Sequence, residues 1–308
     1  MGILAGGRAD GQSGITFRCM KINLEDFRID AGESVDIETL PTRIKPYYSD
    51  EKAYLAALHE GREQMGEAQK RLYASANHAV LILFQAMDAA GKDSAIKHVM
   101  SGIDPQGCQV HSFKAPSSEE LRHDFLWRTT VRLPERGRIG IFNRSYYEEV
   151  LVTRIHPEFL AKQGVPEAEI RSKSLWKGRF RSIVDSEAHL HRNGTRIVKI
   201  FLHISKEEQR KRLLARIDKP EKNWKFSFDD IEDRKQWNRY MKAYEECLEG
   251  TASDIAPWYA VPADDKRNAR LIISRIVVEA LQGLKMGYPV MDKEKRKDLL
   301  AIRKLLED

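Results

Sequence analysis

The sequence has few cysteines and no long hydrophobic run. Its 308 residues include only Cys19, Cys108 and Cys247, and their spacing matches neither a metal-binding pair nor a redox motif. This usage predicts reduced thiols in a cytoplasmic protein. No apolar stretch is long enough to span a membrane, and the first residues lack the hydrophobic segment of a signal peptide. These absences exclude disulfide-stabilised secreted domains and transmembrane proteins.

Acidic residues are outnumbered by basic ones. The 52 Lys and Arg residues against 46 Asp and Glu give a net charge of +6, which favours a polyanionic partner but is also a common means of staying soluble. At this length the chain can bury a large core, so we predict one main domain over residues 46–284. A partly disordered extension over 1–45, with an arm lying on the core from residue 22, precedes it. A charged helix over 285–308 follows it.

The most informative stretch is an apolar run followed by a phosphate-loop pattern. Residues 79–84 are all apolar, and helical spacing begins after Lys92. Continuous apolarity is typical of a parallel strand buried on both faces. The free amides that open the helix, with its dipole, suit a phosphate group, and Lys92 would add a positive charge. The predicted phosphate-binding residues are Ala89, Ala90, Gly91, Lys92, Asp93 and Ser94.

This loop departs from the pattern G-x-x-x-x-G-K-[S/T] in three ways. Ala86 replaces the first glycine, Asp93 replaces the Ser or Thr that holds magnesium, and Asp88 places a carboxylate inside the loop. Because phosphate repels a carboxylate unless a cation lies between them, Asp88 predicts a bound Mg²⁺ or a role in positioning the acceptor phosphate. A strand-to-helix turn with a chance Gly-Lys is the alternative.

A second polar segment follows the predicted strand at residues 139–142. In open α/β sheets ligands bind beyond the carboxyl ends of the strands, so Asn143 and Arg144 are expected beside the phosphate loop. Asn143 occupies the place of a magnesium-binding aspartate, and its amide oxygen can still ligate the ion. The planar group of Arg144 suits the bridging of two phosphates, with an ion pair to Glu148 or Glu149 as the alternative.

Strand and helix patterns alternate after residue 79, which predicts a doubly wound sheet of five parallel strands. The other strands are expected at residues 109–113, 197–204 and 257–262. Helices are expected at 168–191, at 230–249 with a stop at Gly250, and from the Ser117–Glu120 capping box to about residue 133.

The stretch after the fourth predicted strand is basic and broken by proline. A helix opened by Ser205 and Glu208 leads into a polar segment over 218–227 that carries two aromatic residues. This is where small P-loop kinases keep a lid, which excludes water so that the phosphoryl group reaches its acceptor. We predict a helical lid over about 210–230, with an ordinary surface loop as the alternative.

Together these features indicate phosphoryl transfer, in which positioning and charge neutralisation supply most of the catalysis. Two other classes fit part of the pattern: an ATP-dependent nucleoside monophosphate kinase and a nonenzymatic nucleic-acid-binding module. The second class leaves Asp88 unexplained, and the sequence lacks the interleaved aromatic residues expected for binding single strands.

Several motifs in order resemble the polyphosphate kinase 2 family, and the resemblance covers about residues 46–284. They are Met87-Asp88-Ala89-Ala90-Gly91-Lys92-Asp93, Pro105-Gln106-Gly107, Phe125-Leu126-Trp127-Arg128, Phe142-Asn143-Arg144-Ser145-Tyr146-Tyr147-Glu148, Lys222-Asn223-Trp224-Lys225-Phe226-Ser227 and Ala256-Pro257-Trp258. The resemblance implies a thymidylate-kinase-like P-loop fold and reversible phosphoryl transfer between inorganic polyphosphate and AMP or ADP. It also implies Mg²⁺, or Mn²⁺ in its place. The segment from Asn143 to Leu151 is similar to the class that accepts both nucleotides.

The same resemblance assigns residues by position. It implies catalytic roles for Asp88, Lys92 and Arg144, with Asp88 and Asn143 as metal ligands. Polyphosphate is expected along Lys114, Arg128, Arg210, Lys222 and Lys225, and the nucleotide at Asn143, Arg144, Tyr147, Glu148 and Glu149. A homo-oligomer, dimer or tetramer, is expected because family members usually assemble. Nucleic acid and membranes are not expected as partners.

Overall fold

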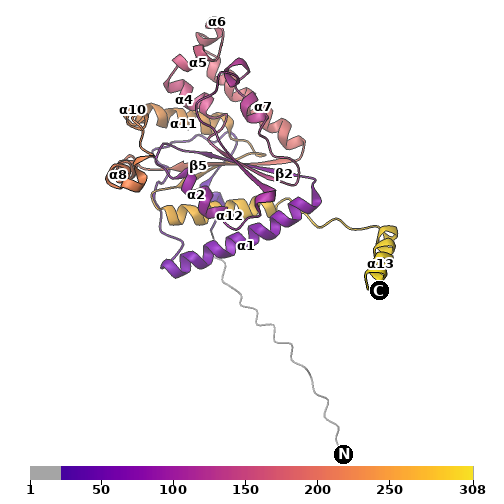
Figure 1. Cartoon of the computed structure of the whole chain (residues 1–308). Coiled ribbons are helices and arrows are strands. Elements are labelled where there is room, and N and C mark those ends of the chain that lie inside the picture. The colour runs from indigo at the N-terminus through magenta and orange to yellow at the C-terminus, as the bar shows by residue number, and fades with distance from the viewer. Residues whose placement is uncertain (1–21, 308) are drawn as a thin grey trace, which may run out of the picture.

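The computed structural model describes residues 22–307, which form a layered α/β fold with a six-stranded sheet in the order β1-β6-β5-β2-β4-β3 (Figure 1). The strands are β1 (Arg28–Ile29), β2 (Ala79–Gln85), β3 (Cys108–Ser112), β4 (Ile139–Asn143), β5 (Thr195–His203) and β6 (Trp258–Pro262). The five predicted strands are all present and parallel to one another. The sequence did not predict β1, which pairs antiparallel with β6, because two residues are too short to show a period.

Strand β2 lies between β5 and β4 in the interior of the sheet. All seven of its residues are therefore buried. It pairs with β5 on one side and β4 on the other, so the chain leaves β2 where the strand order reverses. In doubly wound sheets this point opens a crevice at the carboxyl ends of the strands. The fold therefore places the predicted phosphate loop where a ligand can enter.

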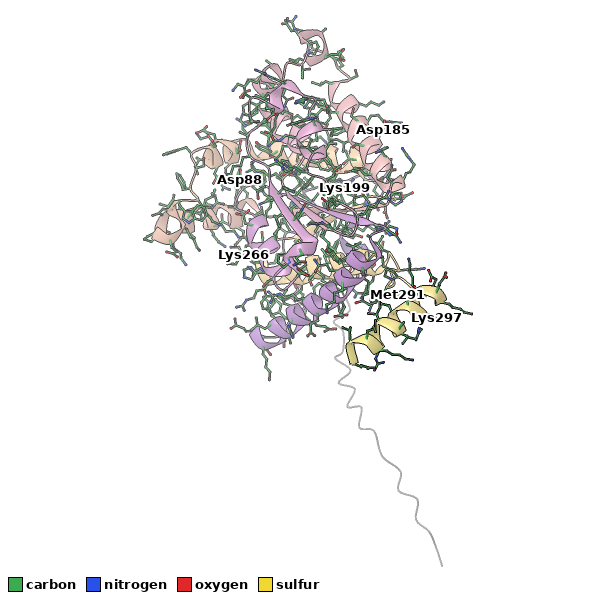
Figure 2. The ribbon with its side chains drawn as sticks, turned by 45° about the vertical axis from the view of Figure 1, so that its right-hand side comes forward. Asp88, Asp185, Lys199, Lys266, Met291 and Lys297 are labelled. Carbon is green, nitrogen blue, oxygen red and sulfur yellow. The ribbon has the colours of Figure 1, made fainter. Side chains whose placement is uncertain are left out.

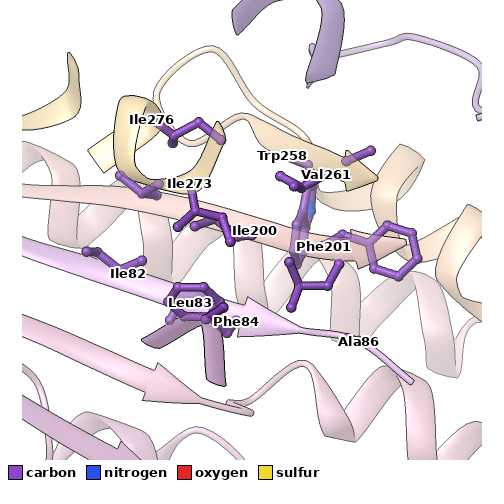
Figure 3. Close-up of a cluster of buried hydrophobic side chains, with 14 of the residues drawn as sticks. Ile82, Leu83, Phe84, Ala86, Ile200, Phe201, Trp258, Val261, Ile273 and Ile276 are labelled. Carbon is purple, nitrogen blue, oxygen red and sulfur yellow. The ribbon is translucent and has the colours of Figure 1, made fainter. Parts of the chain in front are cut away.

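Helices cover both faces of the sheet (Figure 1). One face carries α1 (Glu51–Ser75), α2 (Lys92–Val99) and α12 (Lys266–Gln282), and the other carries α4 (Glu148–Ile155), α7 (Leu175–Arg192) and α11 (Trp237–Thr251). Ile273 and Ile276 of α12 pack over the strands that carry Ile82 and Ile200 (Figure 3). Full burial of each such side chain contributes roughly 1.5–3 kcal/mol, so this layer holds the strands in register.

Two predicted long helices are each divided in two. The helix expected at 168–191 consists of α6 (Glu167–Ile170) and α7, because Ser172 and Ser174 bond locally at the break. The helix expected at 230–249 consists of α10 (Asp229–Lys235) and α11. The predicted stop at Gly250 is wrong, since α11 runs through it to Thr251. A Cβ atom at Gly250 would lie 2.8 Å from the Phe180 ring, so this glycine permits close packing of α11 on α7.

The capping box of Ser117 and Glu120 is formed, with backbone-to-side-chain bonds of 2.7 and 3.2 Å. The single helix predicted after it is wrong, because only η3 (Glu120–Arg122) and α3 (Trp127–Thr130) form. The remaining helices are η1 (Leu24–Phe27), η2 (Pro105–Gly107), α5 (Glu158–Lys162), α8 (Lys206–Asp218), α9 (Pro220–Asn223) and α13 (Lys293–Glu307). In the range 22–307, no helix has the length and apolar content needed to cross a bilayer.

The two ends of the described chain differ in packing. Leu24, Phe27 and Ile37 are buried in the core, so the arm predicted from residue 22 does lie on the domain. The predicted disorder of the first residues falls outside the described range. At the other end every residue of α13 is exposed, including Leu305 and Leu306, so its apolar stripe does not pack on the core.

Candidate active site

The phosphate loop joins the end of β2 to α2 through two residues in the left-handed region. Ala89 has φ 61° and Gly91 has φ 107°. The amide of Ala95 is the first to bond back into the helix, to Gly91 O at 2.9 Å. The amides of Lys92, Asp93 and Ser94 precede it, so they have no acceptor within the helix. Together with the positive end of the helix dipole they are suited to bind a phosphate group.

Lys92 extends beneath this loop. Its ammonium group donates to the carbonyl oxygen of Ala86 at 2.7 Å and to that of Met87 at 3.4 Å, and the side chain is buried. Burial, followed by the positive charge of Arg144, lowers the pKa of Lys92. A bound phosphate would offset both effects, because it replaces the lost hydration with a negative charge.

Arg144 connects the end of β4 to the loop. Its guanidinium donates to the Asp88 carboxylate at 2.7 Å and lies 3.7 Å from the Glu148 carboxylate. The backbone of Arg144 has φ 64°, and its amide bonds to Phe84 O at 3.1 Å. The negative charge of Glu148 raises the pKa of Arg144, whereas burial raises that of Glu148 and Arg144 opposes this shift. The sequence left open an ion pair between Arg144 and Glu148 as the alternative to phosphate binding. This ion pair is present, alongside the contact of Arg144 with Asp88.

Asn143 and the lid meet at Asp93. The amide nitrogen of Asn143 donates to Asp93 Oδ1 at 2.8 Å, which directs its amide oxygen away from Asp93. The ammonium group of Lys225, in the segment between α9 and α10, lies 3.7 Å from Asp93 Oδ2. The predicted lid therefore reaches the first turn of α2 and brings a positive charge to the loop. The carboxyl end of β4, next to this turn, carries three of the predicted site residues: Asn143, Arg144 and Glu148.

Comparison with known proteins agrees with this geometry. A family model described as Polyphosphate kinase 2 (PPK2) matches residues 48–288. The chain belongs to the polyphosphate kinase 2 family. This finding confirms the family resemblance seen in the sequence, and the family's P-loop kinase fold agrees with the parallel sheet and its flanking helices.

Relatives in the polyphosphate kinase 2 family cover most of the chain. An ADP-polyphosphate phosphotransferase of Rhodopseudomonas palustris is 59% identical over 93% of this chain and 99% of its own. An AMP/ADP-polyphosphate phosphotransferase of Meiothermus ruber is 43% identical over 81% of this chain and 89% of its own. The crystal structure of polyphosphate kinase 2 from Arthrobacter aurescens TC1 aligns with a TM-score of 0.79 and 38% identity over 90% and 95% of the two chains.

Two residues predicted to bind nucleotide face away from the loop. The Tyr147 side chain is buried and its hydroxyl donates to Glu187 at 2.7 Å. The Glu149 carboxylate is buried against Arg179 at 3.4 Å and also bonds to Gln163. We therefore remove Tyr147 and Glu149 from the proposed nucleotide site. Both side chains bond to groups outside the loop, Tyr147 to Glu187 and Glu149 to Arg179 and Gln163, which residue order alone does not reveal.

The residues predicted along the polyphosphate path fall into two groups. Lys114 and Arg128 follow the edge strand β3, where Arg128 Nη2 donates to Lys114 O at 2.7 Å and its Nε lies 3.4 Å from Glu120. Lys222 and Lys225 lie in the predicted lid, and Lys225 is 3.7 Å from Asp93 in the first turn of α2. The residues predicted along the path therefore form two basic regions, one after β3 and one in the predicted lid.

In α8 the residue that contacts the loop is not the predicted one. Arg210 is exposed and pairs with Glu207 at 3.0 Å. Arg212 is buried and donates to Ala90 O and Ala263 O, each at 2.6 Å, so it joins the loop to the end of β6. Glu208, one turn earlier, pairs with Arg212 at 2.9 Å. The spacing of Glu208 and Arg212 by one helical turn could have indicated that Arg212, rather than Arg210, is the arginine that contacts the loop.

Ser94 and the β4 tip are held by groups outside the loop. Arg270 of α12 donates to Ser94 Oγ at 2.8 Å, which fixes the first turn of α2. Behind the carboxyl end of β4, Lys199 lies in the interior of the domain (Figure 2). Its ammonium group is 2.8 Å from Glu187, the residue that also accepts from Tyr146 and Tyr147. Sequence reasoning missed this pair, because a lysine within an apolar strand pattern gives no sign of its partner.

Proposed function

We propose that this member of the polyphosphate kinase 2 family transfers a phosphoryl group between inorganic polyphosphate and AMP or ADP. The observation that carries the proposal is the contact of Arg144 with Asp88 directly beside a helix N-terminus that is suited to phosphate. The names of the two relatives described above support the choice of donor and acceptors. The basic regions after β3 and in the predicted lid supply positive charge for a polyanion.

Each group has a role in this transfer. The reaction breaks one P–O–P bond of polyphosphate and forms a bond between that phosphorus and a terminal phosphate oxygen of the nucleotide. The α2 amides and Lys92 hold phosphate oxygens, and Arg144 neutralises charge that spreads over the transferred group. Asp88, fixed by Arg144, orients the acceptor side of the site. Lys225 brings the lid against Asp93 and excludes water.

The residues present fit a magnesium ion of the kind that phosphoryl-transfer enzymes use. Mg²⁺ there takes one or two protein oxygens and completes its shell with substrate phosphates and water. Such a site needs no cluster of three or more protein ligands, and none is found within residues 22–307. Asp88 and the amide oxygen of Asn143 would hold the ion, or Mn²⁺ in its place. When bound, the ion would neutralise phosphate charge.

We also propose a homo-oligomer and a cytoplasmic location. The exposed apolar stripe of α13, which includes Leu299, Leu305 and Leu306, supports the first. The free thiols of Cys108 and Cys247 and the use of adenine nucleotides support the second.

The test mixes purified protein with Mg²⁺ and long-chain polyphosphate, and with ADP or AMP in parallel reactions, and detects ATP by luminescence. We expect ATP from both acceptors. ATP from ADP alone would restrict the acceptor to diphosphates. No ATP from either, combined with phosphorylation of AMP by an ATP donor, would reject polyphosphate as the donor. A steep decrease of polyphosphate binding with salt, which counterion release produces by analogy with nucleic acids, is a second check.

A further inference from the structure

Gln209 connects the lid to the phosphate loop. We propose that it is a positioning residue: its side-chain amide couples docking of lid helix α10 to the orientation of the Asp88–Ala89 peptide. The inference rests on the proposed function, because it concerns the same phosphoryl-transfer site.

Both ends of the Gln209 amide are bonded. Its Nε2 donates to the backbone oxygen of Asp88 at 3.1 Å, and its Oε1 accepts from Arg234 Nη1 at 2.8 Å. The residue has 0% exposure, so water cannot replace either partner. A guanidinium can only donate and a carbonyl can only accept, which leaves one orientation for the amide. The loop and the lid therefore share a single buried side chain.

The peptide that Gln209 holds is a strained one. Ala89, which follows Asp88, has φ 61°, a region that costs an L-residue about 1–2 kcal/mol. Rotation of the Asp88–Ala89 peptide would relieve this φ, and it would turn the Asp88 carbonyl oxygen and the Ala89 amide away from their present directions. Ala89 is one of the residues predicted to bind phosphate, so this rotation would alter the phosphate loop. The bond from Gln209 to Asp88 O opposes that rotation.

The other partner of Gln209 belongs to α10, which begins at the end of the predicted lid. Arg234 belongs to α10, and its Nη1 donates to Lys206 O at 2.7 Å as well as to Gln209. Arg216 of α8 also pairs with Asp230 of α10. When α10 moves away from α8, Gln209 loses Arg234 and its amide is free to turn. Docking of α10 thus stabilises the loop conformation in which the Asp88 carbonyl oxygen faces Gln209.

Two substitutions separate the two halves of this connection. Gln209→Glu can still accept from Arg234 but has no N–H for Asp88 O, whereas Arg234→Met removes the lid contact alone. We expect each to lower kcat about 10-fold, the effect of one well-placed hydrogen bond, with KM for polyphosphate and nucleotide within 2-fold. The double variant should be no slower than the slower single variant, because both changes interrupt one chain of contacts.

A second readout distinguishes positioning from general damage. Trypsin should cleave the lid segment 219–225 faster in Arg234→Met than in the wild-type protein, and at the wild-type rate in Gln209→Glu. Arg239→Met is the matched control, since Arg239 is an exposed arginine of α11 bonded to Gln236 and Ile155. It should leave kcat unchanged. If Gln209→Glu does not fold, Gln209→Met, of similar volume, takes its place with the same expected kcat.

Wild-type kcat in either single variant, or losses that multiply in the double variant, would overturn the inference. Failure of the proposed function would look different, because the wild-type protein itself would then form no ATP from polyphosphate.

Discussion

The Asp88 carboxylate accepts a hydrogen bond from Arg144 at 2.7 Å, and this contact joins the ends of two adjacent strands. Asp88 follows β2 and precedes Ala89, which has a positive φ. Arg144 follows β4 and has a positive φ itself. The contact therefore depends on two unusual backbone conformations at once.

Asp88→Asn removes the charge of the carboxylate while keeping its shape. We expect ATP formation from polyphosphate to fall about 10²- to 10³-fold, the loss typical of one preorganised charged group. Binding of polyphosphate should persist, because the α2 amides and Lys92 are untouched. Calorimetric titration with polyphosphate and the luminescence assay measure the two quantities. Asp185→Asn, an exposed carboxylate of α7, is the control, and an unchanged rate in Asp88→Asn would remove Asp88 from the mechanism.

Arg212→Ala and Arg210→Ala form a matched pair on α8. Loss of Arg212 leaves the buried carbonyl oxygens of Ala90 and Ala263 without a donor, at about 1–3 kcal/mol for each buried group. We expect a lower melting temperature and a lower kcat. Arg210→Ala should leave the melting temperature within a degree or so, because exposed ion pairs contribute little. Equal effects of the two substitutions in thermal denaturation would contradict the assignment.

Glu187→Gln tests the buried ion pair of Lys199 and Glu187, which lies behind the carboxyl end of β4. The change leaves the Lys199 ammonium buried without its counter-charge, which typically costs about 3–5 kcal/mol. Lys199→Met combined with Glu187→Gln should recover part of the loss, because no unpaired charge remains and the glutamine oxygen can still accept from the tyrosines. Urea denaturation measures all three variants. A double variant less stable than Glu187→Gln alone would refute this account of the pair.

Asp230 should make stability depend on pH. Burial, followed by the negative charge of Asp88, raises the pKa of Asp230 to about 6 from its ordinary 3.8, although Arg216 and Arg144 oppose the shift. The folded protein therefore binds this proton more tightly than the unfolded chain does. Consequently the contribution of Asp230 to the free energy of unfolding increases as the pH falls from about 6 toward 3.8, and it is smallest above pH 6.

Asp230→Asn resembles the protonated form at every pH. Its melting temperature minus that of the wild-type protein should therefore be more positive at about pH 7 than at about pH 5. Thermal denaturation across this range in matched ionic strength measures the difference. The Asp185→Asn variant provides the reference for a carboxylate outside the lid. A difference that stays constant with pH would show that Asp230 titrates alike in both states.

The central strand and its loop could be predicted because their signal is local. Six consecutive apolar residues identify β2, and the Gly91-Lys92 pair marks where the helix begins. The same holds for the other parallel strands. Helix boundaries were predicted less well, because they depend on the local hydrogen bonds of Ser172 and on the close packing of Gly250 against Phe180, and the sequence identifies neither.

Site residues were predicted where a reactive or charged side chain directly follows a strand. They were missed where the direction of the side chain determines what it contacts. Asp88, Lys92 and Arg144 follow strand ends, so topology alone brings them together. Tyr147 and Arg210 were assigned by type and order, and the structure turns one into the core and the other to solvent. Gln209, a neutral residue among charged ones, gave no signal at all, because its importance arises from partners distant in the chain, Asp88 and Arg234.

The edge strand β1 has a consequence for how the chain reaches its folded state. Arg28 and Ile29 pair with Tyr259 and Trp258, and the amide of Val35 bonds to Glu249 at 2.8 Å. During synthesis this edge of the sheet stays open until the ribosome has released β6. Contacts of such long sequence separation form slowly, and an open strand edge can pair with another chain. Nascent copies of this protein should therefore be most prone to aggregate just before the first residues of the domain meet the last strand.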